Sequence, residues 1–292
     1  MNHVSIFGLW VAIPTFFTDN YAIDLDTFTK HISSIHQDIN GFVIAGTTGE
    51  GILLTISEIN DLINAASLVT KKPIFVCLSI INYCDTVNFL QQIDQSRIQG
   101  LMILPGVYFS TTRQNILEMF RVVKSLTNLP LIVYNNPKRT GIDLTPEIID
   151  DIMSQHGAQI VAIKESSGSV VRIFDLVSLF KLRNYSCSIL TGDDTLFIES
   201  VQAGAAGIIS VAGNLVPNLI KELIFNESIP KNTLNTWNHL TQTLRLFPNP
   251  QGVKLVLCEW LKKPFVCRAF VSKFHEKDRV LLCEIFDKII SK

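Results

Sequence analysis

Short apolar segments alternate with amphipathic segments along most of the chain. The apolar segments predict eight strands, at Leu9–Thr15, Gly41–Ala45, Pro73–Leu78, Gly100–Leu104, Pro130–Tyr134, Ile160–Lys164, Ser188–Thr191 and Gly207–Val211. The amphipathic segments predict the helices between them, at Asp24–Gln37, Ser57–Thr70, Asp85–Gln95, Thr112–Leu126, Pro146–His156, Val170–Phe180 and Asp194–Ala203. Apolar strands that alternate with helices are typical of a parallel sheet buried on both faces. The pattern therefore predicts an α/β fold, a (β/α)8 TIM barrel.

Signals at the helix starts support this division of the chain. Thr55 and Glu58 have the spacing of a capping box, and Thr145 is followed by Pro146, which suits the first turn of a helix. A doubly wound open sheet would show the same alternation, but the chain has no Gly-x-Gly-x-x-Gly turn. We therefore favour the barrel and assign it to residues 1–226.

Three further helical patterns follow the eighth strand, at Leu234–Leu246, Val253–Leu261 and Lys277–Ile290. A (β/α)8 barrel needs only one helix after its eighth strand, so these patterns exceed what the barrel requires. No linker rich in proline, glycine or serine separates them from the barrel. We expect residues 227–292 to form a C-terminal helical appendix that packs on the barrel.

The composition favours a small-molecule partner. Of the 292 residues, 47% are hydrophobic, which is enough for one large core. There are 25 Lys and Arg against 26 Asp and Glu, and no basic run. The charge therefore gives no indication of a nucleic acid or an anionic membrane surface as a partner.

Cysteine and histidine spacings bear on metals and on the compartment. The 6 cysteines form no Cys-x-x-Cys pair and the 6 histidines have no ligand spacing, so we predict no metal site and a reducing compartment. Residues 5–17 lack the basic start and cleavage site of a signal peptide. Residues 200–220 are uncharged, but they contain glycines, asparagines and a proline that a membrane helix would tolerate poorly. We expect a cytoplasmic protein.

Lys164 closes an apolar predicted strand, where a lysine is unusual. Burial disfavours the charged form of an amine, and a neutral amine can attack a ketone whereas an ammonium cannot. We interpret Lys164 as a Schiff-base nucleophile. Taken alone, the segment fits a solvated lysine at a strand end equally well.

Polar residues follow several predicted strands, at Gly46–Glu50, Tyr134–Gly141, Lys164–Glu165 and Gly192–Asp194. In a barrel these loops meet at one end and build the active site. Thr47 and Thr48 would suit a carboxylate, although the glycines beside them could merely make a tight turn. Tyr134 could relay protons or be a core aromatic, and Arg139 could bind a carboxylate or lie on the surface.

The motifs GTTGE, YNxPxRTG, IKE and GDD, in this order and at these strand ends, resemble the dihydrodipicolinate synthase family of pyruvate-dependent aldolases. That superfamily also contains N-acetylneuraminate lyase. The resemblance covers nearly the whole chain, including Pro248–Pro250 and Val253–Lys254 of the appendix. It implies condensation of pyruvate with L-aspartate 4-semialdehyde, giving 4-hydroxy-tetrahydrodipicolinate in the diaminopimelate route to lysine.

The resemblance also implies residue roles. Lys164 would form an imine with pyruvate, so that no cofactor is needed. Thr47 and Tyr134 would form a proton relay with a tyrosine from a neighbouring subunit, which we assign to Tyr108. A tyrosine shared in this way requires an oligomer, expected as a homotetramer made of two dimers.

Four further residues would bind substrate by the same resemblance. Thr48 would hold the pyruvate carboxylate, and Arg139 the carboxylate of the semialdehyde. The backbone near Gly192 and Ile209 would orient the bound keto acid.

The chain departs from the family pattern in two turns near the predicted site. An apparent extra residue lies in Leu104–Phe109, where the family has paired tyrosines directly after proline. Cys77–Ser79 stands where a glycine-rich turn follows the third strand. These changes leave open a non-catalytic paralogue that uses the barrel for binding.

A third departure concerns regulation. Gly51, Ile52 and Ile56 stand where lysine-inhibited members carry small polar and histidine residues, and Thr86 stands at an acidic position. A bound lysine would lack a counter-charge and polar partners. We therefore predict weak or absent inhibition by L-lysine.

The nearest alternative activity is that of a sialic-acid or sugar-acid lyase, which would share the lysine and the tyrosine. Arg139 within YNNPKRTG speaks against it, because sugar-cleaving members lack that arginine and often carry serine in place of Thr47.

Overall fold

The strands form a closed parallel barrel in the computed structural model, which describes residues 6–80, 82–106, 111–225, 229–271 and 274–290. In chain order they are β1 Gly8–Ala12, β2 Gly41–Ile44, β3 Ile74–Ser79, β4 Gly100–Leu104, β5 Leu131–Asn135, β6 Ile160–Glu165, β7 Ser188–Thr191 and β8 Gly207–Ser210. The predicted barrel is confirmed. β1 ends at Ala12, before the predicted Thr15, because Pro14 has no N–H for the sheet.

Alternate side chains along each strand face the barrel interior and the helices. The interior cluster includes Trp10, Phe75, Met102 and Ile132. The outer cluster joins the other faces of the strands to the helices. Tyr134 lies two residues after Ile132 and shares its inward face, so it points into the carboxyl end of the barrel.

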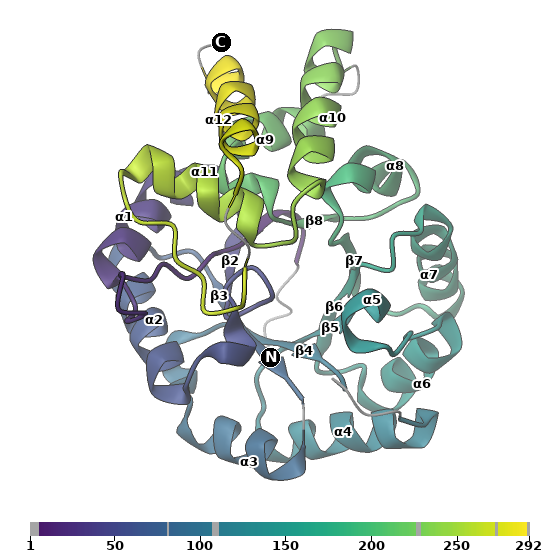
Figure 1. Ribbon diagram of the computed structural model, residues 1–292. Coiled ribbons are helices and arrows are strands. Elements are labelled where there is room, and N and C mark those ends of the chain that lie inside the picture. The colour runs from purple at the N-terminus through teal and green to yellow at the C-terminus, as the bar shows by residue number, and fades with distance from the viewer. Residues whose placement is uncertain (1–5, 81, 107–110, 226–228, 272–273, 291–292) are drawn as a thin grey trace.

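Helices surround the strands (Figure 1). They are α1 Leu25–Ile35, α2 Ile56–Val69, α3 Tyr83–Gln92, α4 Arg113–Leu126, α6 Pro146–His156, α7 Val170–Arg183 and α8 Phe197–Gln202. The predicted capping box of Thr55 and Glu58 is confirmed, and Thr145 is the N-cap of α6 without a side-chain bond to the helix. α7 runs beyond the predicted Phe180 and ends where Asn184 adopts the left-handed conformation.

Among the described residues, two α-helices are present that the sequence pattern did not predict, α5 Pro137–Thr140 and α9 Pro217–Phe225. α5 is too short to show a period. α9 begins inside the uncharged stretch of residues 200–220, which hides its amphipathic pattern, although Pro217 at its start was an available signal. Its Ile220 and Leu223 are buried in the outer cluster.

The appendix consists of α10 Lys231–Arg245, α11 Gln251–Leu261 and α12 Glu276–Ile290, which lie together on one side of the ring (Figure 1). Trp237 of α10 packs edge to face on Phe197 of α8, with 5.9 Å between ring centroids. The boundary at residue 226 stays a prediction, because residues 226–228 lie outside the described part of the chain. Within that part, no helix combines the length and hydropathy needed to cross a membrane.

Candidate active site

A cavity of about 410 Å³ lies at the carboxyl end of the barrel strands. It brings together residues that are far apart in the sequence, namely Thr47, Thr48, Tyr134, Arg139, Lys164 and Gly192. Tyr134 and Lys164 lie at the ends of β5 and β6, and the other four residues follow β2, β5 and β7. This is the end of a barrel at which catalytic residues gather.

Lys164 and Tyr134 are neighbours across the sheet. They are paired in the register of β5 and β6. Both side chains are buried, with 6% of Lys164 and 4% of Tyr134 exposed. The Lys164 amine lies 4.2 Å from the centroid of the Tyr134 ring, and no described carboxylate forms an ion pair with it. The amine is therefore held against a phenol without a counter-ion.

Gly192 makes room for the Lys164 side chain. A Cβ at this position would lie 2.6 Å from Lys164 Cε and 2.0 Å from Ser166 Oγ. Neither contact is possible without movement. The sequence assigned Gly192 a backbone role toward the substrate, and the structure adds this steric role toward the nucleophile.

The appendix reaches the cavity through Asn249. Its side-chain Nδ2 donates to Thr48 Oγ1 at 3.1 Å, and its carbonyl oxygen accepts from Arg139 Nη2 at 3.3 Å. Thr48 is buried, whereas Arg139 is exposed at the cavity mouth. Asn249 thus links the two side chains predicted to bind carboxylates. The Pro248–Pro250 segment was the only sequence signal for it.

Glu50 of the GTTGE motif is a structural residue. Its carboxylate pairs with the Lys254 amine at 2.7 Å, and both side chains are at most 2% exposed. It also accepts from the backbone N–H groups of Arg268 and Ala269, at 2.8 Å and 3.1 Å. A buried carboxylate needs this many partners. The pair fastens the loop of Thr47 and Thr48 to α11.

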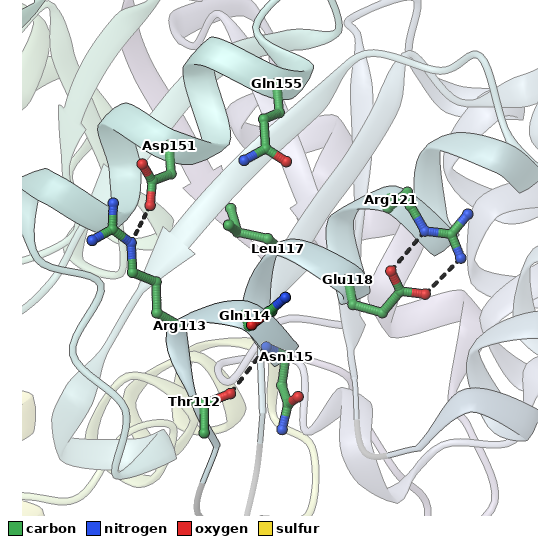
Figure 2. Close-up of a pocket in the computed structure, with 9 residues that line it drawn as sticks. All are labelled: Thr112, Arg113, Gln114, Asn115, Leu117, Glu118, Arg121, Asp151 and Gln155. Atoms are coloured by element: carbon green, nitrogen blue, oxygen red, sulfur yellow. Dashed lines mark hydrogen bonds and ion pairs between the residues drawn. The ribbon is translucent and has the colours of Figure 1, made fainter.

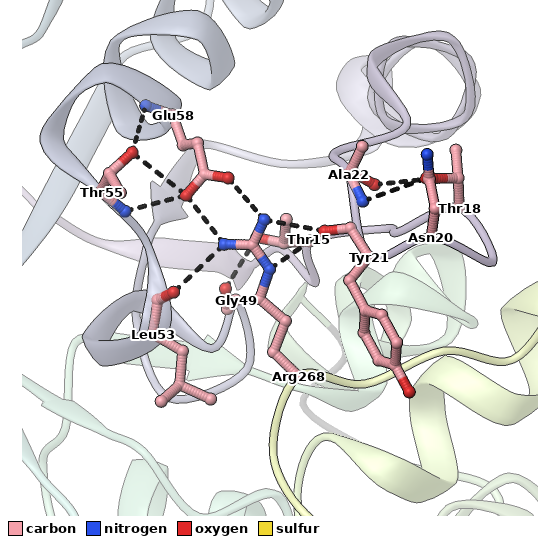
Figure 3. Close-up of polar contacts among 10 residues, drawn as sticks. All are labelled: Thr15, Thr18, Asn20, Tyr21, Ala22, Gly49, Leu53, Thr55, Glu58 and Arg268. Atoms are coloured by element: carbon pink, nitrogen blue, oxygen red, sulfur yellow. Dashed lines mark hydrogen bonds and ion pairs between the residues drawn. The ribbon is translucent and has the colours of Figure 1, made fainter.

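Arg268 holds the outer side of the same loop (Figure 3). It donates to Glu58 Oε2 at 2.8 Å, to the Leu53 carbonyl at 3.2 Å and to the Tyr21 carbonyl at 2.8 Å. Its hydrogen bonds to Glu58 hold the pKa of that carboxyl at about 2. The appendix therefore fixes the loop after β2 from both sides.

Asn135 and Glu165 fix the loops after β5 and β6. Asn135 Nδ2 donates to Glu165 Oε2 at 2.9 Å and to Asp143 Oδ1 at 3.1 Å. Glu165 also accepts from the Ser167 N–H at 2.6 Å. These motif residues thus support the loop that carries Arg139.

Asp194 joins the loops after β7 and β8. It accepts from the N–H groups of Val211 and Ala212, both at 3.0 Å, and from the Ser210 hydroxyl. Burial raises the pKa of its carboxyl. Ile209, predicted to orient the keto acid through its backbone, is a fully buried interior residue, and the cavity lining from this segment is Val211.

Tyr108 lies outside the described residues, so its place in a relay stays a prediction. Cys77, which the sequence analysis placed in a turn after the third strand, is part of β3 and faces the barrel interior. Burial raises the pKa of its thiol to about 12. Its side chain therefore behaves as a small apolar group.

A larger hollow of about 950 Å³ lies on the outside of the barrel between α4 and α6 (Figure 2). Its charged side chains already form ion pairs with one another. Arg113 pairs with Asp151, and Arg121 pairs with Glu118 at 2.5 Å. The residues that line it include no lysine, histidine or cysteine, so the cavity around Lys164 is the better site in spite of its smaller volume.

A third pocket, of about 220 Å³, holds the residues on which the lysine prediction rests. Gly51, Ile52 and Ile56 line it, together with Asp85. The expected lack of a counter-charge is therefore wrong, because Thr86 is buried and the carboxylate comes from the residue before it. Weak inhibition stays a prediction, which now rests on the apolar part of the lining, although Thr55, Ser79 and Asn88 also line the pocket.

Within the described chain, no group of three or more His, Cys, Asp or Glu side chains is placed to hold a metal ion. That the site uses neither metal nor cofactor stays a prediction.

The sequence profile of the Dihydrodipicolinate synthetase family matches residues 5–285. The chain belongs to this family. A 4-hydroxy-tetrahydrodipicolinate synthase of Persephonella marina is 35% identical over 213 residues, which are 72% of this chain and 71% of that protein. A synthase of the same name from Rickettsia bellii is 32% identical over 219 residues, 74% of this chain and 72% of that protein.

Solved structures of the family share the fold. The 4-hydroxy-tetrahydrodipicolinate synthase of Methylacidiphilum fumariolicum has a TM-score of 0.89 and 25% identity, covering 98% of this chain and 97% of that one. A dihydrodipicolinate synthase of Thermotoga maritima has a TM-score of 0.90 and 24% identity, covering 98% and 99%. The family resemblance stated from the motifs is confirmed.

Proposed function

We propose that the chain condenses pyruvate with L-aspartate 4-semialdehyde through an imine on Lys164. The observation that carries this proposal is the buried Lys164 amine beside the Tyr134 phenol in a cavity rimmed by Arg139. The synthase names of the relatives support the choice of reaction.

The first half of the reaction concerns pyruvate. The Lys164 amine adds to the keto carbon, the carbonyl oxygen leaves as water with the two amine protons, and a C=N bond remains. Thr48 holds the pyruvate carboxylate. Tyr134, with Thr47 and a Tyr108 from a second copy of the chain, moves the protons. This role for Tyr108 makes the active unit a homo-oligomer, proposed as a tetramer.

The second half forms the carbon–carbon bond. Transfer of a methyl proton to the imine nitrogen gives an enamine. Its carbon attacks the aldehyde, the N–H proton passes to the new oxygen, and the C=N bond to Lys164 is restored. Arg139 holds the carboxylate of the semialdehyde with charge-assisted hydrogen bonds. The amino group of the semialdehyde portion then adds to the imine carbon and gives its two protons to the departing Lys164 nitrogen. This closes the ring of 4-hydroxy-tetrahydrodipicolinate and frees the Lys164 amine.

Replacing Arg139 with alanine separates the two halves. We expect the KM for the semialdehyde to rise on the order of 10- to 100-fold, since a hydrogen bond to a charged group contributes about 1.5–3 kcal/mol. The pyruvate adduct should form at an unchanged rate. Arg121→Ala, which removes an exposed guanidinium on α4, is the control and should change neither.

Kinetics of Arg139→Ala equal to those of the unmodified protein would contradict the assigned carboxylate contact. Cleavage of N-acetylneuraminate or a sugar acid, without semialdehyde turnover, would replace the proposed reaction with the lyase alternative.

A further inference from the structure

Among the described residues, the Tyr134 hydroxyl has one hydrogen-bond partner, Asn136. No role has been assigned to Asn136 so far. Asn136 Nδ2 donates to the phenolic oxygen at 2.8 Å. Asn136 is half-buried and lines the same cavity as Lys164.

The backbone of Asn136 is fixed by the short helix that follows it. As the N-cap of α5, its carbonyl accepts from the N–H groups of Arg139 and Thr140, at 3.0 Å and 3.1 Å. The Thr140 hydroxyl donates to the same carbonyl at 3.1 Å. These bonds fix the backbone of Asn136, and this backbone places the side-chain amide beside the Tyr134 hydroxyl.

The chemistry of the two groups fixes the direction of this bond. An amide nitrogen only donates, so the phenolic oxygen accepts and its own hydrogen must point elsewhere. The described residues offer that hydrogen no acceptor. The directions left to it lead into the cavity that holds the Lys164 amine.

We propose that Asn136 is a positioning residue that directs the Tyr134 O–H into the cavity and holds the phenolic oxygen while it gives up its proton. The inference rests on the proposed imine chemistry and adds a residue to it. Hydrogen bonds to a charged oxygen are about twice as strong as those to a neutral one. The amide therefore assists proton transfer more than it assists pyruvate binding.

The neighbouring asparagine has a different task. Asn135 bonds to Glu165 and Asp143, so it supports loops, whereas Asn136 acts toward the cavity. The YNxP motif leaves the position of Asn136 open. The role is thus a property of this chain's own residue.

A double-mutant cycle tests the proposal, with the pyruvate adduct measured by borohydride quenching and intact mass. Asn136→Leu should lower the limiting rate of adduct formation about tenfold and leave the half-saturating pyruvate concentration within about twofold, as expected for an effect of about 1.4 kcal/mol on the proton-transfer step. Asn136→Asp should lower the rate further, because a carboxylate accepts the phenolic hydrogen and turns it away from the cavity.

The same two substitutions in a Tyr134→Phe background provide the control. Without the phenolic oxygen, neither should slow adduct formation further. An equal slowing in both backgrounds would assign Asn136 a merely structural role, and an unchanged rate in Asn136→Leu would remove its role altogether. If the unmodified protein forms no adduct, the proposed function fails first and this inference fails with it.

Discussion

Gly192 determines where the Lys164 side chain can lie. The space that a Cβ would take is filled by Lys164 Cε and Ser166 Oγ. The sequence singled out Lys164 and Tyr134 as candidate site residues, because both close apolar strands, and the structure places them in one cavity. It did not predict that of Asn249, because its partner Thr48 is 201 residues away and only the fold brings them together.

Gly192→Ala should therefore displace the nucleophile. We expect a loss of more than tenfold in the rate of pyruvate adduct formation, since small misplacements of reacting groups are costly. Borohydride trapping measures the rate, and circular dichroism checks that the fold is kept. Gly46→Ala is the matched control in the same cavity, because its Cβ would meet Met102 Cε at an ordinary 3.7 Å. Equal rates in the two variants would contradict the steric account.

At the scale of elements, the Glu50–Lys254 pair joins the loop after β2 to α11. The strands were predictable because their apolar runs are short and uninterrupted. Packing of the appendix on the barrel was predicted as well, but the residues that attach it were not, because a charged side chain gives no sequence sign that it will be fully buried. α9 was not predicted because its first turn lies in an uncharged stretch and its charges, Lys221 and Glu222, are adjacent, so they show little helical period.

Lys254→Met should leave the Glu50 carboxylate buried without its counter-charge. Removing one partner of a buried pair costs about 3–5 kcal/mol, and we expect a loss of this size in the free energy of unfolding measured in urea. The double variant Glu50→Gln with Lys254→Met should recover part of it. Lys30→Ala, which breaks an exposed pair with Asp26, should cost less than about 1 kcal/mol. A Lys254→Met loss no larger than that of Lys30→Ala would contradict the structural role of the pair.

At the scale of the whole molecule, the prediction about inhibition by L-lysine concerns a pocket separate from the cavity. The pocket beside β3 and α3 offers the Asp85 carboxylate but also the apolar Ile52 and Ile56. The sequence analysis assigned the acidic position to Thr86, one residue after Asp85. Which residues of a helix face a pocket becomes known only once the helix has been placed in the structure.

We expect weak or absent inhibition by L-lysine. The ammonium of a bound lysine would find Asp85, but Ile52, Ile56 and Ile59 line much of the pocket. Desolvation of the other charged groups of lysine against these side chains is not fully repaid. A coupled assay of semialdehyde consumption with increasing L-lysine measures the effect. Inhibition at submillimolar lysine would contradict this prediction and would show that the Asp85 carboxylate is enough to bind lysine in the pocket.

The central claim is that Lys164 forms a covalent imine with pyruvate, and borohydride reduction in the presence of pyruvate, followed by peptide mapping, tests it most directly. The account predicts a pyruvate-derived adduct on Lys164, none on the buried Lys254, and none in a Lys164→Arg variant. A folded protein without an adduct, or with the adduct on another lysine, would contradict it.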